Sequence, residues 1–128
     1  MNPLHFLVVF VGAGLGGMLR HAVNAVAPRL VGLSFPYGTL AINISGSLVM
    51  GLLAGYFATK HDPGQVWRLF LTTGVMGGYT TFSAFSLETV LLYERGEFLL
   101  SAIYVAGSVV LSVAALLAGL IIVRHLGG

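Results

Sequence analysis

Two rows of polar side chains stand inside long apolar stretches of the sequence. In the first row Thr39, Asn43 and Ser47 recur at intervals of four residues. The second row, with the same spacing, consists of Tyr104, Ser108 and Ser112. Side chains four residues apart share one face of a helix, so each row predicts a polar stripe. Hydrogen bonding between helices explains an isolated Ser or Thr well, but two aligned stripes with a central Asn43 favour a pathway through the membrane.

The chemistry of these stripes favours an anion. Hydroxyl and amide hydrogens are donors that can replace the water shell of an anion. The first row contains an amide and hydroxyls but no carboxylate at its centre. Hydroxyl and amide oxygens can also act as acceptors, so a cation remains possible, although these stripes suit it less well than an anion.

Residues 74–86, with the sequence GVMGGYTTFSAFS, form the least helix-like stretch inside an apolar segment. Each Gly costs about 1 kcal/mol relative to Ala in a helix, and the β-branched Thr80 and Thr81 weaken it further. We therefore expect a helix that is broken near the middle of the membrane. Such a break is tolerated only where protein or a cavity surrounds the freed backbone groups, and freed carbonyls can hold a cation such as Na⁺.

Phe82 and Phe85 follow this stretch at a spacing of three residues, and Glu88 lies one turn further on. A Phe pair at helical spacing is usually packed in a core or faces lipid. The edge of an aromatic ring is positive, however, so ring hydrogens can meet an anion. Glu88 is interpreted as a vestibule group or a protonatable binding carboxylate, with simple exposure at the membrane interface as the alternative.

The composition points to an integral membrane protein. Of 128 residues, 57% are hydrophobic and 8% charged, against roughly 25% charged in soluble domains, and the mean hydropathy is +0.96. The sequence has no cysteine and no basic run, so we expect no disulfide, no thiolate chemistry and no nucleic-acid partner. Its four histidines lack metal-ligand spacing, and no nucleophile has a base at a recognisable offset, so an enzyme is not expected.

Four apolar stretches without Lys, Arg, Asp or Glu predict four transmembrane helices, because roughly 20 apolar residues cross a bilayer. We place these helices at about 4–27, 37–59, 65–93 and 98–125. Pro28 is expected to end the first helix. The fold class is therefore an all-α membrane protein with one domain over residues 1–128, and both termini lie on the same side.

The positive charges give no clear orientation in the membrane. One side would carry Lys60, Arg68 and Arg124, and the other Arg29, Arg95 and Arg20, the last snorkelling outward. Because the Lys/Arg bias of the loops orients membrane proteins, three against three predicts insertion in both orientations, unless the insertion machinery or folding breaks the tie.

Antiparallel copies of the chain would supply the inverted symmetry that many transporters carry in a single chain. Small-residue patterns suit close association of helices. The sequence contains three of them, at Gly12–Gly16, Gly51–Gly55 and Gly74–Gly78. Each pattern is weak alone, but together they favour a compact homodimer.

Three motifs are similar to those of a known family: GGMLR at 16–20, GTLAINISGS at 38–47 and the long stretch 74–86. Through them the chain resembles the Fluc (CrcB-type) fluoride channels of bacteria over nearly its whole length. The resemblance implies a passive channel that exports fluoride across the bacterial inner membrane, built as an antiparallel dual-topology homodimer with two pores.

The resemblance also implies roles for individual residues. Asn43 would donate to fluoride, and Phe82 and Phe85 would meet it with their ring edges. The rest of the polar track, with Glu88 near its end, would consist of Tyr104, Ser108, Ser112 and Thr39. Backbone carbonyls of Gly77 and Thr80 from both subunits would bind a structural Na⁺ at the dimer interface. Structural roles are expected for Arg20, Gly78 and Thr81.

Two other functions stay open. A small multidrug-resistance-type exporter is also short, four-helical and able to insert both ways. It needs a membrane-embedded carboxylate that exchanges protons for a cationic drug, whereas the first helix here has Arg20 and Glu88 lies off-centre. In a non-conducting assembly protein, the polar stripes would only join helices.

Overall fold

The computed structural model describes residues 1–59 and 62–126, which form helices and connecting turns without a strand. Three long helices are continuous: α1 (Pro3–Val31), α2 (Tyr37–Phe57) and α6 (Phe98–Leu126). The remaining long segment is made of four shorter pieces. These are α3 (Gln65–Leu69), the π-helix η1 (Phe70–Met76), α4 (Gly77–Tyr79) and α5 (Phe82–Glu94).

The three continuous helices are long and apolar enough to cross a membrane. The shortest, α2, has 21 residues, which at ~1.5 Å per residue matches a hydrocarbon core of about 30 Å. Large apolar side chains such as Phe10 and Leu99 are exposed along the bundle, as expected of surfaces that face lipid.

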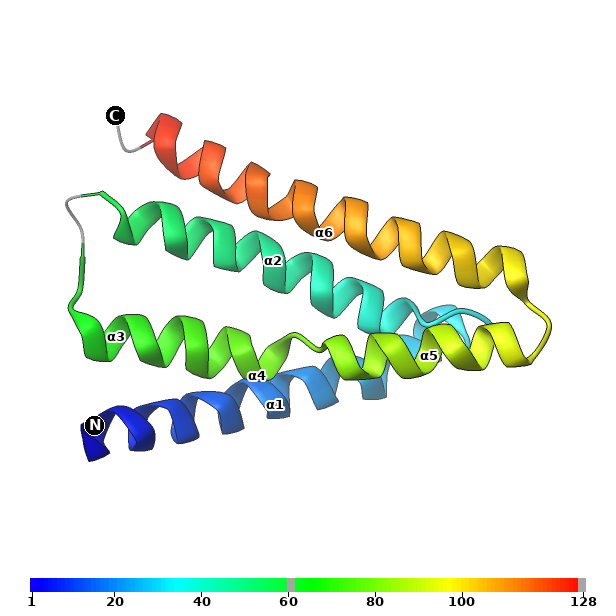
Figure 1. Cartoon of the computed structure of the whole chain (residues 1–128), viewed down its shortest axis with the longest axis horizontal. Coiled ribbons are helices and arrows are strands. Elements are labelled where there is room, and N and C mark those ends of the chain that lie inside the picture. Colours follow the sequence, from blue (N-terminus) through cyan, green and yellow to red (C-terminus); the bar gives the residue numbers. More distant parts are fainter. Residues whose placement is uncertain (60–61, 127–128) are drawn as a thin grey trace.

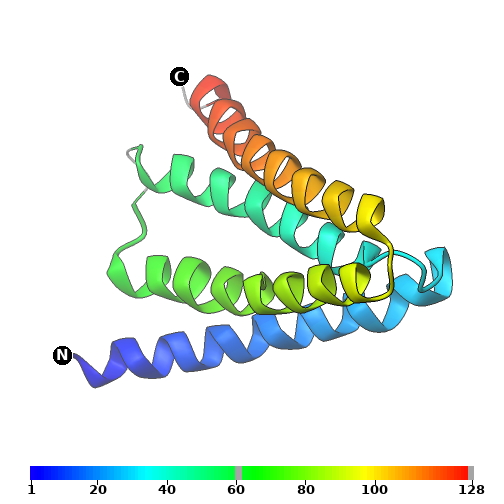
Figure 2. The same cartoon turned by 45° about the vertical axis from the view of Figure 1, so that its right-hand side comes forward.

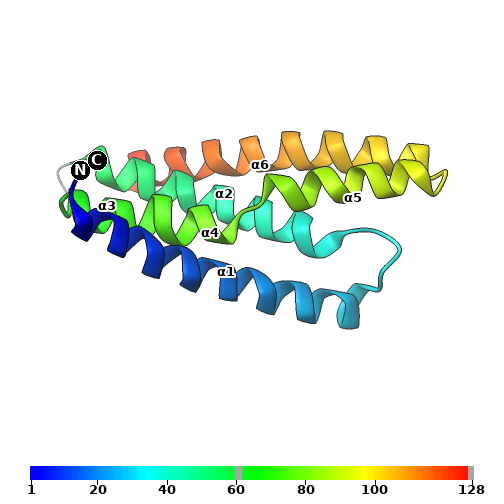
Figure 3. The ribbon, with the colours of Figure 1, turned by 60° about the horizontal axis from the view of Figure 1, so that its bottom comes forward.

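Successive long segments run antiparallel, so the described ends of the chain lie at the same end of the bundle (Figure 1). This agrees with the prediction that both termini share one side. Helix α1 packs against η1 and α4, while α2 packs along α6. Figure 2 shows the two pairs diverging toward the end that carries the termini. The interrupted third segment, from α3 to α5, lies beside α1 over its first half and passes toward α6 over its second (Figure 3).

The small-residue patterns serve contacts within the chain. A Cβ built on Gly12 would lie 2.7 Å from the carbonyl oxygen of Phe70 and 2.9 Å from the Cα of Gly74. Gly51 on α2 is likewise packed against the backbone of Leu116 on α6. Our expectation that these patterns favour a homodimer is therefore not supported, because the glycines are already in use between helices of the same chain.

The predicted end of the first helix was wrong. Helix α1 continues through Pro28 to Val31 and ends where Gly32 adopts φ +82°. The Gly32 N–H donates to the Pro28 carbonyl over 3.0 Å. A proline removes one N–H and crowds the preceding turn, yet the helix continues for three residues beyond Pro28. The positive φ, which glycine adopts freely, turns the chain instead.

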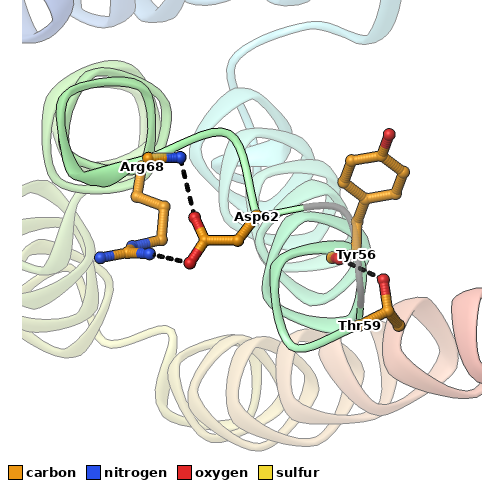
Figure 4. A network of polar contacts seen from close by, with 5 residues as sticks. Tyr56, Thr59, Asp62 and Arg68 are labelled. Atoms are coloured by element: carbon orange, nitrogen blue, oxygen red, sulfur yellow. Dashed lines mark hydrogen bonds and ion pairs between the residues drawn. The ribbon is translucent and has the colours of Figure 1, made fainter.

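The turn between α2 and α3 is organised by Asp62 (Figure 4). Its carboxylate accepts a hydrogen bond from the N–H of Gly64 over 2.8 Å and forms an ion pair with Arg68. On the other side of the turn, the Thr59 hydroxyl donates to the Tyr56 carbonyl over 2.6 Å. Lys60, which the predicted charge balance includes, lies outside the described residues.

Candidate functional site

The third segment is interrupted at Thr80 and Thr81, whose backbones are extended, with φ/ψ of −81°/156° and −149°/120°. The predicted break is confirmed, although its depth in the membrane stays a prediction. Thr81 then starts α5 as its N-cap, because its hydroxyl accepts a hydrogen bond from the N–H of Ala84 over 3.1 Å.

Asn43 on α2 satisfies the backbone exposed by this break. Its Nδ2 donates to the carbonyl of Thr81 over 3.0 Å, and its Oδ1 accepts from the N–H of Thr81 over 2.9 Å. A helix break inside an apolar bundle needs such partners, since unpaired backbone groups are costly there. The side chain that the sequence marked as a donor in a polar stripe is therefore also the partner of the broken backbone.

Arg20 also reaches the break. Its Nε–H donates to the carbonyl of Gly78 over 3.2 Å, so the prediction that Arg20 snorkels outward was wrong. The end of a helix leaves its last carbonyls without intrahelical donors, and Gly78 offers such an acceptor. Without Arg20, the side of the membrane that was predicted to carry three positive charges carries two, those of Arg29 and Arg95.

The break frees the backbone carbonyls of Gly77 and Thr80 from their usual donors. In an uninterrupted helix they would accept from the N–H groups four residues on, those of Thr81 and Ala84. The first of these N–H groups bonds to Asn43 and the second to the Thr81 hydroxyl. The two carbonyls are candidate ligands for a cation, whereas the described residues contain no cluster of His, Asp or Glu that could hold a metal ion.

A cavity of about 360 Å³ lies beside the break, between α2, α5 and α6. It brings together five predicted pathway residues: Asn43, Phe82, Phe85, Ser108 and Ser112. The hydroxyl oxygens of Ser108 and Ser112 are buried and have no hydrogen-bond partner among the described residues. Buried polar groups are nearly always paired, so these two hydroxyls are free to bond to a guest or to water. The cavity therefore offers hydroxyl donors to a guest.

The two phenylalanines form a tilted pair at one wall of this cavity. Their ring centroids are 5.4 Å apart, with an angle of 53° between the planes. Phe85 is 9% exposed and packs against Tyr104, whereas Phe82 is 77% exposed. The exposed ring leaves this side of the cavity open to lipid or to another chain.

Glu88 joins the ends of the two polar rows. Its carboxylate accepts hydrogen bonds from Thr39 over 2.7 Å and from Tyr104 over 3.3 Å. Both donors are almost completely buried, whereas Glu88 itself is half-buried, and its role in a pathway stays a prediction. Because Tyr104 also packs against Phe85, a continuous set of contacts leads from the cavity to this carboxylate.

A second cavity, of about 570 Å³, lies beyond Glu88 and Thr39, toward the loop between α1 and α2. Its lining includes Asn24 and Arg95, which were not among the predicted site residues. Asn24 follows Arg20 by four residues, so the same spacing rule that found the other polar rows would have found it. The predicted track therefore extends over two cavities.

These features define a class: an integral membrane protein of apolar helices with polar side chains buried between them. Comparison with known proteins agrees. The family described as "CrcB-like protein, Camphor Resistance (CrcB)" matches residues 7–120. The chain belongs to the CrcB family, and the resemblance found in its motifs is confirmed.

Three relatives are similar over almost the whole chain. "Fluoride-specific ion channel FluC 2" of Nitrobacter hamburgensis is 62% identical over 96% of this chain and 99% of its own length. "Fluoride-specific ion channel FluC" of Rhodopseudomonas palustris is 60% identical over 93% and 96%. The protein of the same name from Methylobacterium nodulans is 60% identical over 97% and 99%.

Proposed function

We propose that this chain is a fluoride channel whose pathway passes through the cavity beside the helix break. The observation that carries the proposal is the pair of buried, unpartnered hydroxyls of Ser108 and Ser112 next to the tilted rings of Phe82 and Phe85. The names of the relatives, which specify fluoride, support the choice of ion.

The cavity suits a small anion that must lose its water. A hydrogen bond to a charged partner contributes roughly 1.5–3 kcal/mol, so two serine hydroxyls and the second Nδ2–H of Asn43 offset part of the dehydration cost. The edges of Phe82 and Phe85 add positive ring hydrogens. None of the described residues that line this cavity is charged, so no carboxylate there repels the anion.

The channel is proposed to be passive and to export fluoride from the cytoplasm of a bacterium across its inner membrane. Hydrogen fluoride enters as a neutral weak acid and dissociates inside. An inside-negative potential of about 100 mV contributes ~2.3 kcal/mol per charge toward expelling the anion, which corresponds to roughly 50-fold in concentration. No pump is needed under these conditions.

The proposed assembly is an antiparallel dual-topology homodimer with two pores. Two observations support it: the near balance of positive charge between the two sides of the bundle and the open side of the cavity at Phe82. Appending three lysines to the C-terminus should force one orientation. Antiparallel pairs then cannot form, and fluoride flux should be lost. If untagged protein is already labelled from one side only, dual insertion is wrong.

A structural Na⁺ at the dimer interface is proposed to bind the carbonyls of Gly77 and Thr80 from both subunits. The residues fit this role because the donors that a continuous helix would direct at these carbonyls go to Asn43 and Thr81. Gly77 is also exposed on the bundle surface, where a second chain can approach. When bound, the ion would link the interrupted third segments of the two subunits electrostatically.

The proposal is tested by fluoride release from liposomes. Purified protein is reconstituted in vesicles loaded with potassium fluoride, valinomycin is added, and external fluoride is followed with a selective electrode. Matched vesicles loaded with chloride are the control. Rapid release of fluoride but not of chloride is expected. If folded protein releases no fluoride and instead exchanges protons for a lipophilic cation, with Glu88→Gln abolishing the exchange, the multidrug-resistance-type function replaces the channel.

A further inference from the structure

The carboxamide of Asn43 engages both backbone groups of a single residue. Nδ2 donates to the Thr81 carbonyl and Oδ1 accepts from the Thr81 N–H. The side chain thus imitates the backbone partner that the break removes. Thr81 and Asn43 are separated by 38 positions in the sequence, so the contact ties α2 to the start of α5.

The close approach of α2 makes this contact possible. Gly46, one turn after Asn43, has no side chain, and a Cβ built there would collide with the Cγ2 of Thr80 and lie 3.2 Å from the ring of Tyr79. The absence of that carbon lets the backbone of α2 lie directly beside the break. Asn43 then reaches Thr81 with a short side chain.

The two hydrogen bonds to Thr81 also determine that Asn43 presents a donor, and not an acceptor, to the cavity. An amide that is turned over would direct its NH₂ at the Thr81 N–H and its oxygen at the Thr81 carbonyl, which places donor against donor and acceptor against acceptor. The oxygen of Asn43 is therefore held by the backbone. The group left for a guest in the cavity is the second Nδ2–H, which is a donor.

A further consequence concerns the end of α4. The Thr81 N–H that bonds to Asn43 is the group that would otherwise bond to the Gly77 carbonyl and continue the helix. On removal of Asn43 we expect this N–H to return to Gly77, so that the break closes by one residue and the carbonyl is lost as a cation ligand.

We propose that Asn43 is a positioning residue, which holds the third segment open at Thr81 and keeps its own oxygen turned away from the ion. This inference rests on the proposed function for its link to fluoride and Na⁺. The pair of hydrogen bonds between the Asn43 side chain and the Thr81 backbone, called the clamp below, is a property of the fold. It can be measured without fluoride flux.

Amide hydrogen exchange tests the clamp in labelled, purified full-length protein. The Thr81 N–H of the natural protein should be protected, although it has no helical partner. In Asn43→Ala this N–H should bond to Gly77 instead, and a changed carbonyl shift of Gly77 would report that new bond. An unchanged carbonyl shift of Gly77 in this variant would count against the inference. Exchange of the natural protein at the rate of an unstructured peptide would overturn the inference, and this measurement needs no variant that has to fold.

Two further variants separate positioning from direct ion contact. Asn43→Asp keeps an acceptor for the Thr81 N–H but has no donor for its carbonyl, so protection should persist while fluoride flux falls. Ser108→Ala is the matched control: it removes a cavity donor that does not touch the break. It should lower flux and leave the exchange of Thr81 unchanged.

The effect of Na⁺ on thermal stability completes the test. Replacing Na⁺ by N-methylglucamine should lower the melting temperature of the natural protein and of Ser108→Ala, but not that of Asn43→Ala. If Asn43→Ala loses flux while the carbonyl shift of Gly77 is unchanged and Na⁺ still stabilises, Asn43 is only an ion ligand and the inference is wrong. If natural protein has a protected Thr81 but no fluoride flux, the proposed function fails and the clamp stands.

Discussion

Gly16→Ala adds one methyl group where α1 touches the interrupted segment, and it should destabilise the protein strongly. A Cβ at this position would lie 2.8 Å from the backbone nitrogen of Tyr79 and closer still to the carbonyl oxygen of Val75. Real Cβ atoms essentially never approach within 3.0 Å of such neighbours. Both neighbours are backbone atoms, so they cannot move aside as a flexible side chain would, and α1 has to retreat from η1 and α4.

The magnitude follows from what this retreat breaks. Overpacking of a tight interface costs roughly 1–3 kcal/mol. Relief of the contact with Val75 needs a shift of about 1 Å, which also stretches the bond from Arg20 to the Gly78 carbonyl, now 3.2 Å, beyond hydrogen-bonding range. A charged hydrogen bond is worth about 1.5–3 kcal/mol. After the gain of about 1 kcal/mol from the better helix propensity of Ala, we expect a net loss of roughly 1.5–5 kcal/mol.

Gly14→Ala is the matched control, since it makes the same chemical change two residues away on the same helix. Nothing lies within 4 Å of a Cβ built on Gly14, so this variant should be neutral or slightly more stable. The assay is equilibrium unfolding of both variants in detergent, followed by fluoride flux of the folded fraction. The reasoning is refuted if Gly16→Ala unfolds at the same denaturant concentration as Gly14→Ala.

Two other substitutions test the site. Ser108→Ala and Ser112→Ala should leave thermal stability unchanged or slightly higher, because no described partner is lost, yet each should reduce fluoride flux; a clear loss of stability would show that these hydroxyls are structural. Glu88→Ala should cost roughly 1–3 kcal/mol because the buried hydroxyls of Thr39 and Tyr104 lose their acceptor, whereas Glu88→Gln should cost less because these hydroxyls can rotate to accept. Equal unfolding curves for the two Glu88 variants would argue against this arrangement.

Much of the fold could be predicted because the apolar stretches are long and the charges fall between them. The break at Thr80 and Thr81 could also be predicted from the sequence, because paired glycines and β-branched residues weaken a helix. The end of α1 was not, because Pro28 lies within its last turn and the positive φ of Gly32 turns the chain. A proline alone does not specify whether a helix stops at once or completes its turn.

The sequence predicts which face of a helix each site residue lies on, but not which groups these residues contact. Spacing placed Asn43 on a polar stripe, yet nothing in the spacing pairs it with the Thr81 backbone. The bond from Arg20 to Gly78 was likewise hidden, because it joins residues that are 58 positions apart. Small-residue patterns show where backbones come close, but not whether the neighbour of Gly12 belongs to the same chain.

Fluoride is proposed to pass the tilted rings of Phe82 and Phe85, and the fluoride flux of a double variant at these two positions tests this proposal. Natural protein and the Phe82→Ile, Phe85→Ile variant are reconstituted at equal density in vesicles loaded with potassium fluoride, after the oligomeric state of each has been checked. On addition of valinomycin, the natural protein should release fluoride rapidly, and the double variant should release almost none while it remains folded and assembled. Undiminished release from the double variant would contradict the account.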